Sequence, residues 1–113
     1  MTDEDILHEQ IVGYLNRALP QDVIFYHPAN QGKHKPQYQK KLNRMGRLKG
    51  VPDLCFILRG GKAAFMEIKT PKGAMSAEQK WFEHACVELG ALHQVVRSLD
   101  DVDETLTLWG IFK

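Results

Sequence analysis

The chain has 113 residues, of which 43% are hydrophobic and 26% are charged. This composition is typical of an ordinary soluble globular protein, and the length fits one domain, which we expect to span residues 1–113. The sequence has no signal peptide and no apolar run long enough to cross a membrane, so we expect a cytoplasmic protein without a membrane partner. Two cysteines, Cys55 and Cys86, lie in apolar patterns, which favours buried free thiols over a disulfide or a zinc site.

The charged residues are unevenly distributed, although the formal net charge is only +1. No acidic residue lies between Asp22 and Asp53, and the acids gather instead near the two ends of the sequence. The cations in this gap are Lys33, Lys35, Lys40, Lys41, Arg44, Arg47 and Lys49. A local basic block on a nearly neutral protein predicts a surface that faces phosphate groups. The alternative interpretation is a solvated, mobile loop.

The first third of the chain predicts a helix, a short strand and a long loop. Thr2 can cap a helix whose first turn is acidic, and Pro20 ends that helix. The helix has an apolar face made of Leu7, Ile11, Tyr14, Leu15 and Ala18. Residues Val23 to His27 read as a strand, and residues 28–50 as a loop with a helical turn around Gln39 to Met45. A loop of this length in a compact domain is usually functional or disordered.

The rest of the chain predicts a sheet with helices on both faces. Strands are expected at Leu54 to Leu58, Ala63 to Lys69 and Leu92 to Arg97. Helices are expected from the capping box Ser76 and Gln79 to Leu89, and again over about Leu99 to Leu106. Trp81 and Phe82 are predicted to be core residues, and the apolar segment 106–112 could pack on the chain's own core or against a partner. The predicted order is α-β-β-β-α-β-α, an α/β fold with a mixed sheet flanked by helices.

Three of the five charged residues in the hairpin Gly50 to Thr70 lie away from its turn, beside apolar strand residues: Asp53, Glu67 and Lys69. Glu67 and Lys69 are two residues apart, so they project from the same face of their strand. A two-residue turn at Gly60-Gly61 would point Asp53 away from Glu67, whereas a three-residue loop would set Asp53 directly across from Glu67. In the second register the two Cβ atoms would be about 4.5–5.5 Å apart. Two carboxylates that close repel each other unless a cation lies between them.

A divalent metal ion would resolve that conflict. Mg²⁺ accepts carboxylate oxygens, waters and substrate phosphates as ligands, and a bound ion can activate a water molecule. Lys69, one step along the same strand face, can hold the attacking water and stabilise the charged transition state. The combination therefore predicts a site that hydrolyses phosphodiesters. The alternative is a surface salt bridge between Glu67 and Lys69, with Asp53 as a turn residue.

The motifs resemble the PD-(D/E)XK nuclease superfamily and, within it, the VRR-NUC domain family. The resemblance rests on Gly50-Val51-Pro52-Asp53-Leu54, Glu67-Ile68-Lys69-Thr70, Gly73, Ser76, Gln79, Trp81, Gly90 and Val95-Val96-Arg97. It implies a restriction-endonuclease-like core in which Asp53, Glu67 and the backbone carbonyl of Ile68 bind Mg²⁺ or Mn²⁺ and Lys69 assists hydrolysis. It also implies an acid on the first helix, for which we expect Glu4. The alternative for Glu4 is a partner of the helix dipole.

The resemblance also suggests a substrate and an assembly. It implies a Mg²⁺-dependent DNA endonuclease that is specific for four-way junctions or other branched DNA and acts as a homodimer, of bacterial or viral type. The residues expected to contact nucleic acid are Asn30, Lys33, Arg44, Arg47, Lys49 and Gln79. The alternatives are an inactive DNA-binding module of the same fold, a monomeric flap or nicking nuclease, and a hydrolase of another phosphate ester.

Overall fold

The computed structural model describes residues 1–28 and 35–112. The helices are α1 (Asp3–Ala18), α2 (Pro36–Arg44), α3 (Ala77–Leu89) and α4 (Leu99–Leu108). The strands are β1 (Ile24–Tyr26), β2 (Leu54–Leu58), β3 (Lys62–Ile68) and β4 (Leu92–Val96), and a 3-10 turn, η1 (Arg59–Gly61), joins β2 to β3. This order confirms the predicted α/β fold and adds one helix, α2, to it.

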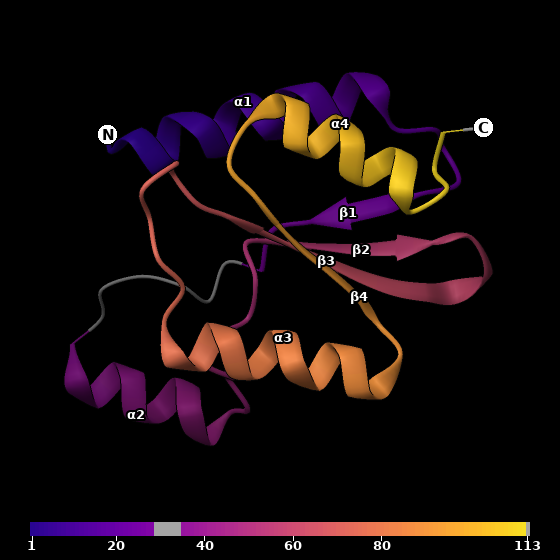
Figure 1. Cartoon of the computed structure of the whole chain (residues 1–113). Helices are drawn as coiled ribbons and strands as arrows, with labels where there is room; N and C mark the ends of the chain where they lie inside the picture. Colours follow the sequence, from indigo (N-terminus) through magenta and orange to yellow (C-terminus); the bar gives the residue numbers. More distant parts are fainter. Residues whose placement is uncertain (29–34, 113) are drawn as a thin grey trace.

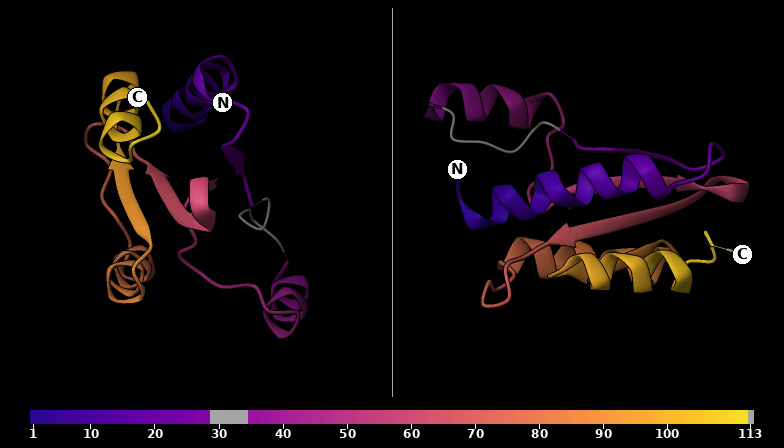
Figure 2. Two further views of the ribbon diagram at one scale, coloured as in Figure 1. Left: turned by 90° about the vertical axis from the view of Figure 1, so that its right-hand side faces the viewer. Right: turned by 90° about the horizontal axis from the view of Figure 1, so that it is seen from above.

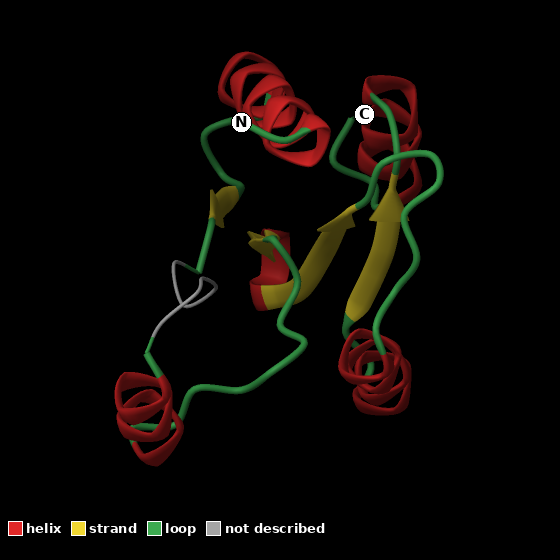
Figure 3. Cartoon of the chain, turned by 90° about the vertical axis from the view of Figure 1, so that its left-hand side faces the viewer, coloured by secondary structure: helices red, strands yellow, loops and turns green. Residues whose placement is uncertain are grey.

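The four strands form one mixed sheet in the order β1-β2-β3-β4. β1 and β3 both run antiparallel to β2, while β3 and β4 are parallel and are joined through α3. Helices α1 and α4 lie side by side over one face of the sheet, and α3 covers the β3–β4 half of the other face (Figures 1 and 2). α2 stands apart from both helical layers (Figure 3).

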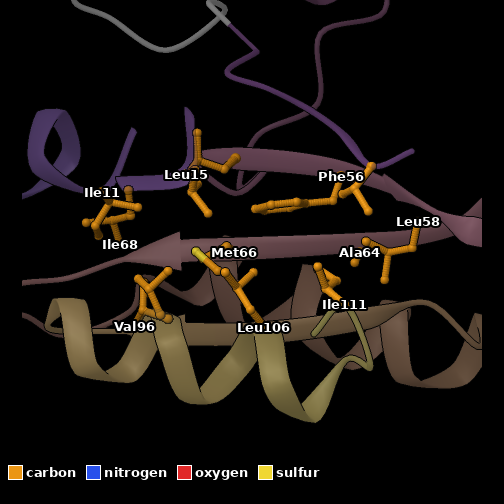
Figure 4. Close-up of a cluster of buried hydrophobic side chains, with 13 residues drawn as sticks. Ile11, Leu15, Phe56, Leu58, Ala64, Met66, Ile68, Val96, Leu106 and Ile111 are labelled. Atoms are coloured by element: carbon orange, nitrogen blue, oxygen red, sulfur yellow. The ribbon is translucent and has the colours of Figure 1, made fainter. Parts of the chain in front are cut away.

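The main core lies between the sheet and the α1–α4 layer. Figure 4 shows Ile11 and Leu15 of α1 facing side chains from the sheet, with Leu106 of α4 and Ile111 completing the cluster. The fully buried members from the sheet include Leu54, Ala64, Met66, Ile68 and Val96. Because alternate residues of a strand point to opposite faces, Asp53 and Glu67 project toward the α3 side of the sheet. In the part of the chain that the structure describes, no helix combines the length and the hydrophobicity needed to span a bilayer.

The helix ends follow the local sequence signals. The Thr2 hydroxyl accepts a hydrogen bond from the Asp5 amide, and the Asp5 carboxylate accepts one from the Thr2 amide, both at 3.1 Å. Ser76 and Gln79 make the same reciprocal pair at the start of α3. Gly90 ends α3 with φ of 81°, a left-handed conformation that glycine adopts without steric cost. The capping box predicted at Ser76 and the helix cap predicted at Thr2 are therefore confirmed, and the structure shows that Thr2 and Asp5 form a second capping box.

Two predictions about individual segments need correction, and one pair of alternatives is decided. The helical turn expected at Gln39 to Met45 is a nine-residue helix that begins at Pro36, because proline suits the first helical position and most of the following residues are good helix formers. Trp81 is 56% exposed and is not a core residue. The end of the chain packs on the chain's own core, since Ile111 is 3% exposed and Phe112 lies against that cluster. This confirms the first of the two alternatives for the apolar segment 106–112, although Leu108 within it is 75% exposed.

Gly50 brings the end of the basic segment directly against the first turn of α3. Its φ is +86°, and a Cβ built on it would lie 2.4 Å from the carbonyl oxygen of Glu78 and 3.0 Å from the amide nitrogen of Gln79. Contacts below 3.0 Å with backbone atoms cannot be relieved by a side-chain rotation. Glycine is therefore required here both for its conformation and for the close approach.

We expect Gly50→Ala to lower the free energy of unfolding by about 2–4 kcal/mol, because it adds a left-handed alanine and a clash with the α3 backbone. Gly90→Ala is the matched control, since its φ is +81° but a Cβ at this position would have no atom within 4 Å. The free energy of unfolding of the control should fall by only about 1–2 kcal/mol, which is the cost of a left-handed alanine alone. Urea unfolding of both variants measures the difference, and equal losses would remove the close approach as the cause.

Candidate active site

The hairpin register places the two central acids opposite each other. Leu58 pairs with Lys62 and Leu54 with Met66, so Asp53 and Glu67 form the next opposed pair along β2 and β3. The connection is the three-residue turn η1, in which Gly61 has φ of 77°. This confirms the second of the two predicted registers. The left-handed glycine makes that turn possible.

Glu67 lies at the centre of the site and is only 2% exposed. Its Oε1 accepts a hydrogen bond of 2.9 Å from Nε2 of Gln79 on α3, and the Lys69 Nζ lies 3.7 Å from the same oxygen. Its Oε2 is buried without a hydrogen-bond partner among the residues that the structure describes. A buried carboxylate oxygen without a partner is costly unless something else, such as a cation, binds it.

Asp53 is held rigidly beside Glu67. Its Oδ2 accepts a hydrogen bond of 2.8 Å from the backbone amide of Ile68, on the strand opposite. Its carbonyl oxygen lies 2.6 Å from Nδ1 of His27. A carbonyl oxygen can only accept, so Nδ1 of His27 carries a proton. The His27 ring in turn packs edge-on against His8 of α1, with 4.7 Å between ring centroids.

The environment of Glu67 strongly favours its neutral form. Burial, followed by the negative charge of Asp53, raises the pKa of Glu67 to about 8, while the Lys69 ammonium lowers it less. Without a bound cation, Glu67 is therefore mostly protonated at neutral pH. The Lys69 ammonium, 3.7 Å from Glu67, then lies beside a neutral carboxylic acid. The two groups form an ion pair only when Glu67 loses its proton.

The donor set fits a magnesium ion. Among the described residues, no three or more Asp, Glu, His or Cys side chains are grouped closely enough to hold a metal by themselves. Mg²⁺ does not require such a cage, because it typically uses one or two carboxylates and completes its shell with water and substrate phosphate. Asp53 and Glu67 supply two carboxylates, and one Glu67 oxygen is buried without a hydrogen-bond partner in the described part of the chain. The cost of burying this pair is what a divalent cation would offset.

Glu4 lies at the rim of the site. Its side chain is exposed in the first turn of α1. Its negative charge nevertheless makes a small contribution to raising the pKa of Glu67, so Glu4 is close enough for its charge to act on the site. The role expected for Glu4 stays a prediction.

The residues predicted to contact nucleic acid fall in two groups. Arg44, in the last turn of α2, and Lys49 are exposed, and Arg47 donates hydrogen bonds of 2.9 and 3.1 Å to the Asn43 side chain. Gln79 is a direct partner of Glu67 and also completes the α3 cap. The remaining two predicted residues, Asn30 and Lys33, lie outside the described residues.

Arg97 is a contributor whose role the sequence did not indicate. Its Nη1 donates hydrogen bonds of 2.7 Å to the carbonyl oxygens of Thr70 and Gly73. These bonds anchor the segment that follows Lys69. The motif Val95-Val96-Arg97 marked the position, but backbone carbonyls have no sequence signature, so no partner could be assigned to Arg97.

The pKa of Glu67 predicts a pH-dependent stability of the metal-free protein. The folded chain keeps a proton up to about pH 8, whereas an unfolded chain releases it near pH 4.3. The contribution of Glu67 to stability is therefore fully present below about pH 4.3 and is lost as the pH rises toward 8, by on the order of a few kcal/mol. Glu67→Gln should remove this pH-dependent loss of stability. Glu9→Gln, on the exposed side of α1, should show the same loss as the wild type. Thermal unfolding in EDTA at pH 5, 7 and 9 measures the slopes, and identical slopes for wild type and Glu67→Gln would contradict the expectation.

For Arg97→Ala we expect faster amide hydrogen exchange in residues 70–75 and a loss of about 1–3 kcal/mol in stability, because two partly buried carbonyls lose a charged donor. Lys80→Ala, which removes an exposed cation of α3, should leave both quantities unchanged. Hydrogen exchange followed by mass spectrometry resolves the segment. Unaltered exchange there would mean that other contacts hold the segment.

Comparisons with known proteins place this geometry in a known fold. No family model matches the sequence, and no curated protein sequence matches it. A solved structure described as a "VRR_NUC domain protein" is similar with a TM-score of 0.72 and 21% identity, over 96% of this chain and 88% of that one. A second, described as a "VRR_NUC domain", has a TM-score of 0.63 and 19% identity, over 95% of this chain and 97% of that one. The chain therefore has the fold of VRR_NUC domains, as the hairpin motifs led us to expect.

Proposed function

We propose that this protein is a Mg²⁺-dependent DNA endonuclease that acts on branched DNA. The observation that carries the proposal is the buried carboxylate pair of Asp53 and Glu67 with Lys69 beside it. Such an arrangement is unstable as a purely structural device, because burial and like charge both oppose ionisation. It becomes favourable when a cation and a phosphate group enter the site. The likeness to VRR_NUC domain structures supports a nuclease-type function for the same residues.

Each residue has a distinct role in this proposal. Asp53 and Glu67 would hold the metal ion, together with the Ile68 carbonyl. When bound, the ion lowers the pKa of a water molecule and offsets the charge of the phosphate. Lys69, with its side chain 13% exposed, donates a hydrogen bond to the attacking water and to the phosphate oxygens. Gln79 keeps the Glu67 carboxylate in place through its hydrogen bond to Oε1.

The basic segment supports DNA as the substrate. Residues 35–49 carry cations throughout and contain no acid, as expected of a surface that follows a phosphate backbone. Their end is fixed against α3 at Gly50, beside the turn that carries Gln79. An extended basic surface suits a polymer better than a small phosphate ester, which would need a closed pocket.

A homodimer is the assembly we propose for cleavage of four-way junctions. Such a junction offers two symmetric scissile strands, and this chain offers one set of Asp53, Glu67 and Lys69. Two copies related by a two-fold axis would cut both strands in one encounter. A monomer would act instead as a flap or nicking enzyme.

The main test is Lys69→Ala with a panel of duplex, flap, nicked and four-way DNA. We expect Mg²⁺-dependent cleavage of branched DNA by the wild type, no cleavage in EDTA, and a rate at least about 100-fold lower for the variant. Its DNA affinity in Ca²⁺ should stay within a few-fold of wild type, because Lys69 acts on the reaction and not on the metal.

Lys72→Ala is the matched control, since it removes a nearby exposed lysine outside the carboxylate pair. Cleavage by Lys69→Ala at the wild-type rate would remove Lys69 from the mechanism. DNA binding by the wild type without cleavage in Mg²⁺ or Mn²⁺ would instead identify an inactive DNA-binding module.

A further inference from the structure

An exposed apolar surface lies next to the candidate site. Trp81 is 56% exposed, Leu48 is 46% exposed and Met45 is 72% exposed. Leu48 and Trp81 line a hollow of about 350 Å³ together with Lys49, Ala77 and Glu78. A tryptophan left this open to water forfeits the stabilisation that its large apolar side chain would gain from burial. Such a position often marks a binding surface.

The hollow joins the basic segment to the helix that supports the carboxylates. One wall, Leu48 and Lys49, is the end of the basic segment, and the other wall is the start of α3. The contact between Gly50 and Glu78 holds these two walls together. Gln79, the partner of Glu67, and Trp81 are two residues apart in α3, so their side chains project from different sides of the helix. The hollow is nevertheless adjacent to the site, because Gly50 approaches the backbone of Glu78 and Gln79 at its edge.

The charge around the hollow indicates the chemistry of its occupant. The cations of the neighbouring segment are Lys35, Lys40, Lys41, Arg44, Arg47 and Lys49. Glu78 is the only acid that lines the hollow, and residues 35–49 contain none. An occupant must therefore combine a flat apolar face for Trp81 with negative charge for the cations. An unpaired nucleobase on its phosphate backbone has both, and stacking on aromatic side chains is how such bases are commonly bound.

We propose that Trp81 stacks on an unpaired base of the DNA strand and so favours DNA with unpaired bases over fully paired duplex. This inference rests on the proposed function and specifies its substrate further. The base lies between Trp81 and Leu48, while Lys49 contacts the adjoining phosphate. A base inside a duplex is already stacked on its neighbours, so it cannot occupy the hollow without being unpaired at additional cost.

Affinity measurements in EDTA, where metal-dependent cleavage is absent, test the proposal directly. Trp81→Ala should weaken binding to flap DNA by about 5- to 150-fold, the range expected for loss of one stacked base. Its preference for flap over duplex should fall by the same factor, and Trp81→Phe should recover most of it. Val87→Ala is the matched control, because Val87 is a 69% exposed apolar residue further along α3. It should bind both DNAs as the wild type does.

Fluorescence provides an independent readout. The chain has two tryptophans, and the second, Trp109, packs edge-on against Phe56 with 5.2 Å between centroids. Single-stranded oligonucleotide should quench the wild-type emission, whereas Trp81→Phe, which retains only Trp109, should show little quenching. Circular dichroism verifies that each variant folds. A Trp81→Phe emission quenched as strongly as that of the wild type would overturn the proposal.

Other outcomes separate this inference from the proposed function. Equal weakening of flap and duplex binding in Trp81→Ala would overturn the stacking role. A difference in mass between Trp81→Ala and the wild type by light scattering, together with unaltered DNA affinity, would also overturn the stacking role. That result would assign the surface to contact between copies of the chain. Loss of cleavage in Lys69→Ala together with normal flap preference in Trp81→Ala would overturn only the stacking role. A wild type that neither binds nor cuts DNA would overturn both.

Discussion

The burial of Glu67 opposite Asp53 is the constraint on which the rest of the structure depends. A carboxylate that is 2% exposed, with a second carboxylate across the strand pair, opposes folding in its ionised form. The protein resolves this in the metal-free state by keeping Glu67 protonated, with a pKa of about 8. A cation would reverse that preference. The same interaction thus makes the ionised pair unfavourable in the metal-free protein, and it is this cost that a cation would offset in the proposed function.

The surrounding elements hold the two acids in place. The turn at Arg59–Gly61 sets the register, the Ile68 amide fixes Asp53, and Gln79 fixes Glu67. Gln79 can reach Glu67 because the α3 cap is formed and because Gly50 allows the backbone to approach closely. The site is therefore built on strands and a helix terminus, which position side chains more accurately than mobile loops do.

The charges of the molecule are separated in a way that suits a polyanionic substrate. The cations of residues 35–49 extend along α2 and end at the first turn of α3, next to the carboxylates. The acids of α4 lie on the opposite side of the sheet from α3, where Asp103 accepts a hydrogen bond of 2.7 Å from the Tyr14 hydroxyl (Figure 2). The cations of residues 35–49 would attract a phosphate backbone and the acids of α4 would repel it, so these two groups favour an approach of the proposed substrate from the α2 side.

The sequence by itself determined the features that depend only on residues close together in the chain. The helix cap at Thr2, the capping box at Ser76 and the glycine stop at Gly90 depend on neighbours a few residues away, so the sequence predicted them directly. Only the tertiary structure decided between the two hairpin registers, because each strand keeps the same alternation in both and glycines at positions 60 and 61 permit either turn. It also decided the partners of Gln79 and Arg97 and the exposure of Trp81. These depend on which distant backbone or side chain packs beside each residue, and no pattern within the segment records that.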